Sequence, residues 1–153
     1  MFTARTVLSI LIGILIGGML GWNLTTIIAP TNTNDLIAEY YQTLSAVHVS
    51  PLELREKVAE GKNEYTIVDL RSAEEYETES IVGAINIPAY SEQSHSEYDE
   101  VDRIVAAFKA LPQDKPIVVY CHSMPCMTGY NIGTMLASHG IYVRHLATGW
   151  GNW

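Results

Sequence analysis

Short apolar runs alternate with helix signals from residue 47 onward, and this alternation most constrains the fold. The runs are YTIVDLR at 65–71, GAINIP at 83–88, PIVVYC at 116–121 and IYVRHL at 141–146. Strands of a parallel sheet appear as such short apolar runs, because helices cover both faces of the sheet. We therefore predict an α/β domain whose central, mostly parallel sheet of about five strands carries helices on both faces.

Capping signals place helices between these strands. Ser50 and Glu53 form a capping box with proline between them, which predicts a helix over 51–60. A second capping box, Ser72 with Glu75, begins a brief helix. Apolar spacing predicts the remaining helices over 35–47, 101–111 and 128–139, while composition predicts a surface loop over 91–100.

The segment from Val7 to Ala29 contains no charged residue. At about 1.5 Å per residue it is long enough to cross a hydrocarbon core of about 30 Å, which favours a retained transmembrane anchor over 7–29 rather than a cleaved signal peptide. Arg5 precedes the segment, and no cation follows it before Arg55. The positive-inside rule then places the N-terminus, 1–6, in the cytoplasm and the C-terminal part outside the inner or plasma membrane, in the periplasm if the source is bacterial.

Residues 30–46 are predicted to form a linker and a stalk helix, and residues 47–153 the folded domain. Within the anchor, Gly13, Gly17 and Gly21 recur every four residues, which would let two copies pack as a homodimer. All 17 acidic residues follow the anchor, so the domain is acidic. This charge argues against nucleic acid as a partner.

Cys121 ends the most apolar of the predicted strands and begins a loop that leads into a helix. In open α/β sheets the reactive groups lie beyond the carboxyl ends of the strands. Backbone N–H groups of such a loop and the positive end of the helix dipole both favour an anion. We therefore expect a nucleophilic thiolate at Cys121.

Several segments resemble, in order and spacing, a single rhodanese-type sulfurtransferase domain. IVDLRSAEEY at 67–76 is similar to the D-x-R-x-x-x-E-[FY] segment of that family, with Asp69 and Arg71 in the matching places. IVGAINIP at 81–88 resembles the strand that follows this segment in the family, and VVYC at 118–121 resembles the strand that carries the catalytic cysteine. LATGWGNW at 146–153 resembles the C-terminal ending of the family. Together they cover nearly all of the predicted domain.

This resemblance implies that Cys121 takes sulfane sulfur from a donor, holds it as a persulfide and passes it to a thiol or another thiophilic acceptor. It implies no metal and no organic cofactor. Asp69 and Arg71 would organise the loop by supporting it without contacting the substrate, or would form only a structural salt bridge at the end of their strand. The loop backbone would cradle the persulfide, through His122, Ser123, Met124, Pro125, Cys126 and Met127. Family members carry Arg or Lys in this loop and this chain has neither, so the resemblance does not extend to thiosulfate as donor.

Cys126 leaves other functions open. In an oxidising compartment it could resolve a persulfide or sulfenic acid on Cys121 by forming a disulfide, as in a thiol–disulfide or sulfur-relay protein. A second alternative is a copper-handling protein whose soft ligands are Cys121, His122, Met124, Cys126 and Met127. A third is a non-catalytic rhodanese-like interaction module. Met127 stands where a related phosphatase branch carries a phosphate-binding arginine, which argues against phosphatase activity.

Overall fold

The structure is a computed structural model that describes residues 32–62, 64–123 and 127–153. Contacts divide the chain into two compact units between Tyr40 and Tyr41, and the second unit, 41–153, contains the sheet. The helix predicted over 35–47 is observed as α2 (Thr33–Val47). Among the described helices, none is both long enough and apolar enough to span a membrane, and the predicted anchor over 7–29 lies outside the described residues.

Five strands form the central sheet, in the order β1-β7-β6-β2-β3, and every neighbouring pair is parallel. Their bounds are His48–Val49 (β1), Thr66–Asp69 (β2), Ile85–Asn86 (β3), Ile117–Tyr120 (β6) and Val143–Leu146 (β7). The sheet confirms the predicted α/β architecture and the predicted number of strands. Because the strands are parallel, their carboxyl ends all lie at one edge of the sheet.

Helices of the second unit lie between these strands in the chain, and a short 3-10 helix follows the last strand. They are α3 (Pro51–Ala59), α4 (Ala73–Thr78), α5 (Val101–Lys109), α6 (Met127–Ser138) and the 3-10 helix η1 (Trp150–Asn152). Ser72 and Glu75 close a complete capping box at the start of α4. At the start of α3, the Ser50 hydroxyl accepts a hydrogen bond from the Glu53 backbone N–H. Both helices therefore begin where the capping signals predict.

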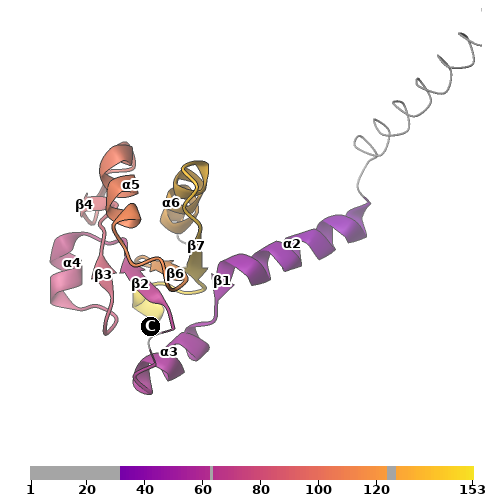
Figure 1. The fold of residues 1–153 in the computed structure, drawn as a ribbon, viewed down its shortest axis with the longest axis horizontal. Helices are drawn as coiled ribbons and strands as arrows, with labels where there is room; N and C mark the ends of the chain where they lie inside the picture. Colours follow the sequence, from indigo (N-terminus) through magenta and orange to yellow (C-terminus); the bar gives the residue numbers. More distant parts are fainter. Residues whose placement is uncertain (1–31, 63, 124–126) are drawn as a thin grey trace, which may run out of the picture. The chain divides into compact units, whose positions relative to one another are not determined.

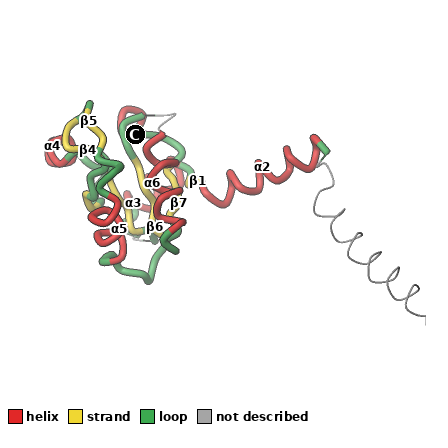
Figure 2. The backbone as a smooth tube through the Cα atoms, turned by 90° about the horizontal axis from the view of Figure 1, so that it is seen from above, coloured by secondary structure: helices red, strands yellow, loops and turns green. Residues whose placement is uncertain are grey.

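Alternate residues of β6 face opposite sides of the sheet. Val119 and Cys121 pack into a core that includes Ile104 and Phe108 of α5 and Ile132 of α6. Val118 and Tyr120 of β6 pack into a second core, on the other side of the sheet, with Leu54 of α3, Ile81, Ala84 and Leu146. Figure 1 shows α5 and α6 on one side of the strands and α3 on the other, and Figure 2 views the domain from the side of α5 and α6. The two-residue period of the strand thus directs the Cys121 side chain toward α5 and α6.

Two features differ from the sequence pattern. β1 is absent from the predicted strands, because two residues between a helix and a capping box are too few to show alternation. Residues 91–100, predicted as a loop, instead contribute to an antiparallel hairpin of β4 (Tyr90–Glu92) and β5 (His95–Ser96). Most side chains of this hairpin are polar and exposed, so no apolar face marks it in the sequence.

Candidate functional site

Cys121 directly follows β6 at the carboxyl edge of the sheet, and it is fully buried. Its carbonyl accepts a hydrogen bond from the backbone N–H of Trp150 at 2.8 Å. The next carbonyl, that of His122, accepts one from the N–H of Gly151 at 2.9 Å. The turn at η1 therefore holds the backbone of the cysteine and of the residue after it.

Asp69 and Arg71 form a buried ion pair at the end of β2. Arg71 Nη2 donates to Asp69 Oδ2 at 2.7 Å, and Arg71 Nε donates to the same carboxylate at 3.1 Å. Burial opposes the guanidinium charge, but the hydrogen bond and the charge of Asp69 outweigh it and raise the pKa of Arg71. The guanidinium carbon lies 4.8 Å from the centroid of the Trp150 ring. The pair thus supports the Cys121 backbone through a single intervening residue, Trp150.

His122 lies between a carboxylate and an aromatic ring. Its Nδ1 is 3.0 Å from Glu75 Oε1, and the two side chains are 24% and 22% exposed. The ring meets that of Tyr90 edge to face, with centroids 5.2 Å apart. His122 Nε2 is buried and makes no hydrogen bond within the described part of the chain.

Three hydroxyl groups meet beside Cys121. The Tyr90 hydroxyl lies 2.6 Å from Thr128 Oγ1 and 2.7 Å from the Tyr98 hydroxyl, and Tyr98 lies 2.8 Å from Thr128. Both tyrosines pack against the core cluster that contains Cys121. Burial raises the pKa of Tyr90 and outweighs the bond with Thr128, which lowers it, while the bond to Tyr98 and the nearby Cys121 raise it further. Tyr90 therefore remains a neutral phenol around pH 7.

The other predicted loop residues fall into two groups. Ser123 is exposed and its backbone lies against η1, while Met127 begins α6 with an exposed side chain. Met124, Pro125 and Cys126 lie outside the described residues, and so do the copper set and the Cys121–Cys126 disulfide of which they are part. Within the residues that the structure describes, no three His, Cys, Asp or Glu side chains are grouped to hold a metal.

Sequence reasoning missed the side chains that the fold brings to this site from other elements. Tyr90 directly precedes, and Tyr98 lies within, the polar segment 91–100 that the sequence presents as a loop. Asn86 donates through Nδ2 to the carbonyls of Asp69 at 3.1 Å and of Arg71 at 3.0 Å. The available signal was two tyrosines within an otherwise polar stretch.

A separate group of rings lies between β1, β7 and α6. His145 is buried, and its ring centroid lies 5.8 Å from that of His48 and 5.4 Å from that of Tyr130. His48 and His145 are register partners on neighbouring strands. A Cβ on Gly129 would come within 2.4 Å of the His145 ring, so glycine is required where α6 crosses it. The sequence places these histidines far apart and does not indicate that they meet.

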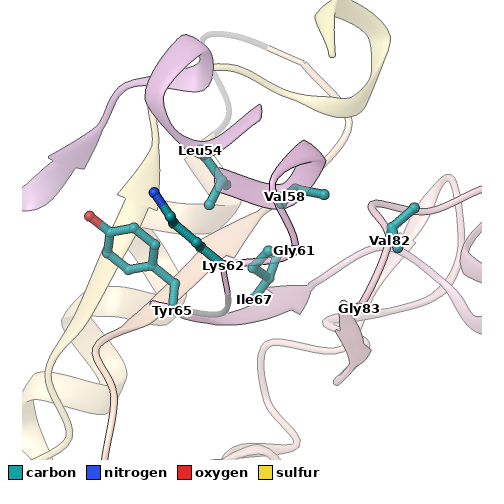
Figure 3. A pocket seen from close by; sticks show the side chains of 8 residues that line it. All are labelled: Leu54, Val58, Gly61, Lys62, Tyr65, Ile67, Val82 and Gly83. Atoms are coloured by element: carbon teal, nitrogen blue, oxygen red, sulfur yellow. The ribbon is translucent and has the colours of Figure 1, made fainter. Parts of the chain in front are cut away.

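A pocket of about 200 Å³ lies near the opposite edge of the sheet (Figure 3). It is lined by Leu54, Val58, Gly61, Lys62, Tyr65, Ile67, Val82 and Gly83. Gly61, Lys62 and Tyr65 precede β2, and Gly83 precedes β3, so the pocket lies at the amino ends of these strands. Since Cys121 follows the carboxyl end of β6, this pocket is not part of the cysteine site.

Comparison with known proteins gives a family for this fold and site. The model of the Rhodanese-like domain family matches residues 50–153, and a search of curated proteins found no match. A solved structure from Bacillus halodurans is 26% identical over 80% of this chain and 80% of that chain, with a TM-score of 0.59.

Two further structures, below 25% identity, support the fold alone. A full-length Lactobacillus plantarum protein is 20% identical over 79% of this chain and 92% of its own, with a TM-score of 0.61. A rhodanese-related protein from Thermoplasma volcanium is 21% identical over 70% of this chain and 89% of its own, with a TM-score of 0.51. Because the family model covers four of the five sheet strands, including the cysteine strand, and the C-terminal turn, this chain belongs to the Rhodanese-like domain family.

Proposed function

We propose that the protein is a sulfurtransferase that carries sulfane sulfur as a persulfide on Cys121. The observation that carries this proposal is the position of Cys121, at the carboxyl end of β6 and immediately before the loop that leads to α6. Reactive groups of open α/β sheets lie at this edge. The carbonyls of Cys121 and of the residue after it accept hydrogen bonds from η1, which holds the backbone that carries the thiol.

The proposed reaction has two steps. The Cys121 thiolate attacks the outer sulfur of the donor, the donor's sulfur–sulfur bond breaks, and the remainder of the donor leaves with the electron pair. A nucleophilic acceptor then attacks the outer sulfur of the persulfide, and the Cys121 thiolate leaves. Sulfur passes from donor to acceptor without a cofactor in this scheme.

Charge narrows the choice of donor. Residues 121–129 contain no Arg or Lys, and the nearby Arg71 is committed to Asp69 in a buried pair. A dianionic donor such as thiosulfate would therefore find no guanidinium or ammonium group in the loop. We propose that the donor is a small persulfide or a short, singly protonated polysulfide, each of which carries one negative charge on its sulfur chain.

Intact-mass measurement of the full-length protein tests this proposal. After exposure to polysulfide, we expect a mass increase of one sulfur atom in the wild-type protein and none in Cys121→Ser. Thiosulfate should give a smaller yield under the same conditions. If no donor adds sulfur and the protein instead loses two hydrogens by forming a Cys121–Cys126 disulfide, the thiol–disulfide alternative replaces this proposal. Cys126→Ser then shows whether the second cysteine changes the rate of sulfur loss from Cys121.

We also propose that residues 7–29 anchor the domain to the inner or plasma membrane, with the N-terminus in the cytoplasm. The support is the uncharged composition of this segment and the position of Arg5. Protease added outside spheroplasts should remove a C-terminal tag while the protein remains in the membrane fraction. A tag protected until the membrane is lysed would reverse the orientation, and a tag found in the soluble fraction would contradict the anchor.

A further inference from the structure

We propose that Glu75 and His122 form a proton-transfer pair for the sulfur acceptor, and that this acceptor is a thiol. In this pair His122 Nε2 takes the proton, and Glu75 is the positioning residue that holds the imidazole. The inference rests on the proposed function, because it concerns the second step at the same cysteine.

The contact between the two side chains favours one imidazole tautomer. A carboxylate oxygen accepts hydrogen bonds, so the 3.0 Å approach of Glu75 Oε1 favours a proton on His122 Nδ1. Nε2 of the neutral ring then carries the lone pair and can accept a proton. A nucleophile beside a base, with the base oriented by a third group, is the general arrangement for activating thiols and hydroxyls.

The surroundings of His122 restrict its movement. Its carbonyl is held by Gly151, and its ring packs edge-on against Tyr90. The other Glu75 oxygen, Oε2, accepts from the Ser72 hydroxyl at 2.8 Å as part of the capping box. Glu75 is therefore tied to the start of α4 while it contacts the imidazole, whose ring packs on Tyr90, the tyrosine near Cys121.

The hydrogen bonding of His122 Nε2 is incomplete. Nε2 is buried and makes no hydrogen bond to any described residue, whereas buried polar atoms in native proteins are nearly always paired. Three described hydroxyls near Cys121 already bond one another, those of Tyr90, Tyr98 and Thr128. A bound molecule with a proton to give, such as a thiol, would complete the environment of Nε2.

The proposed step balances without an oxidant or reductant. The acceptor thiol gives its proton to His122 Nε2, and its sulfur forms a bond to the outer sulfur of the Cys121 persulfide. The bond between the outer sulfur and Cys121 Sγ breaks, and Sγ leaves with the electron pair and takes the proton from Nε2. The products are a small persulfide and the Cys121 thiol. Sulfite, which attacks through a sulfur lone pair with no proton to lose, does not need the base.

This difference between acceptors gives the test. The full-length protein is loaded with polysulfide, and sulfur transfer is then timed with dithiothreitol and, separately, with sulfite. We expect His122→Gln to lower the ratio of the dithiothreitol rate to the sulfite rate about 10²-fold, the lower range for general acid–base catalysis. Glu75→Gln should lower it about 10-fold, because glutamine keeps the capping box but not the carboxylate charge. Glu74→Gln, the same change at an exposed neighbouring position, should leave the ratio unchanged.

A measurement on the wild-type protein complements the variants and does not depend on their folding. Transfer to dithiothreitol should slow in deuterated water by more than transfer to sulfite does. Equal losses for both acceptors in the variants, or an equal isotope effect for both, would assign Glu75 and His122 a purely structural role and overturn the inference. Failure of the proposed function is recognised separately, because the loading step would then add no sulfur to the wild-type protein.

Discussion

The guanidinium carbon of Arg71 lies 4.8 Å from the ring centroid of Trp150, whose backbone N–H donates to the Cys121 carbonyl at 2.8 Å. Arg71 follows the end of β2, and Cys121 follows the end of β6, so Trp150 joins two neighbouring strand ends from the C-terminal turn. Asp69 and Arg71 therefore reach the cysteine only indirectly. Arg71 packs on the Trp150 ring, and the Trp150 backbone bonds the Cys121 carbonyl.

Asp69→Asn should destabilise the protein by about 3–5 kcal/mol, because it leaves the buried Arg71 charge without its counter-ion. Urea unfolding followed by circular dichroism measures this change. Arg71 also donates to the Glu79 carbonyl at 2.7 Å, so part of its hydrogen bonding persists in the variant. A loss below about 1 kcal/mol would show that the pair contributes little more than a surface ion pair does.

Glu97→Gln is the matched control for that experiment. Glu97 pairs with Arg103 at 2.9 Å, but the two side chains are 30% and 38% exposed. Water screens such a pair, and removing it should change stability by less than about 1 kcal/mol. A similar loss in both variants would mean that burial does not explain the effect of Asp69→Asn.

Gly149→Ala should displace the turn that holds the cysteine. A Cβ at this position would lie 2.2 Å from the backbone nitrogen of Ser123, and a backbone atom cannot move aside without shifting the loop. We expect a stability loss of about 1–3 kcal/mol, typical of overpacking, together with slower loading of sulfur on Cys121. Gly151→Ala is the control, because its Cβ would lie an ordinary 3.5 Å from the His122 carbonyl oxygen. Equal effects of the two substitutions would contradict the steric explanation.

The sequence was sufficient to predict those parts of the fold that depend on local signals. The apolar run at 116–121 corresponds to β6, and the capping residues Ser50 and Ser72 mark the starts of α3 and α4. Each of these signals lies within a few residues of the element that it predicts. Local patterns also locate Cys121, since a strand that ends in cysteine before a helix is visible without any tertiary contact.

The surroundings of Cys121 were harder to predict, because they come from distant parts of the chain. Tyr90 reaches the site through a short exposed hairpin, and Glu75 reaches His122 from the first turn of α4. The sequence shows Glu75 only as a capping residue. The contact between Glu75 Oε1 and the His122 ring depends on the fold, in which β2 and β6 lie side by side.

Thr128→Val should lower the free energy of unfolding by about 1–2 kcal/mol, because the buried Thr128 hydroxyl bonds both Tyr90 and Tyr98. Valine keeps the shape of threonine, so the change removes only the hydroxyl group. Differential scanning calorimetry and urea unfolding measure the loss. Thr78→Val is the control, since the exposed Thr78 hydroxyl donates to a carbonyl of its own helix at 2.8 Å. It should change stability by less than about 0.5 kcal/mol. A neutral Thr128→Val would show that Tyr90 and Tyr98 satisfy each other without the threonine.

Alkaline pH should destabilise the protein through its buried tyrosine, Tyr120. Burial, reinforced by hydrogen bonding to Asp69, raises the pKa of Tyr120 from the ordinary value of 10.0. Below that ordinary value both the folded and the unfolded states keep the proton, so the contribution is fully present. As the pH rises above about 10, the unfolded state loses the proton first and stability falls by up to about 1.4 kcal/mol per pH unit for each such tyrosine. Urea unfolding at a series of pH values measures how steeply stability falls with pH. This slope should be shallower in Tyr120→Phe and unchanged in Tyr142→Phe, since the Tyr142 side chain is 80% exposed. Tyr120→Phe also removes the acceptor for the Ile81 N–H, so the variant can be less stable at pH 8 without affecting the test. The same slope in the wild type and in Tyr120→Phe would contradict the prediction.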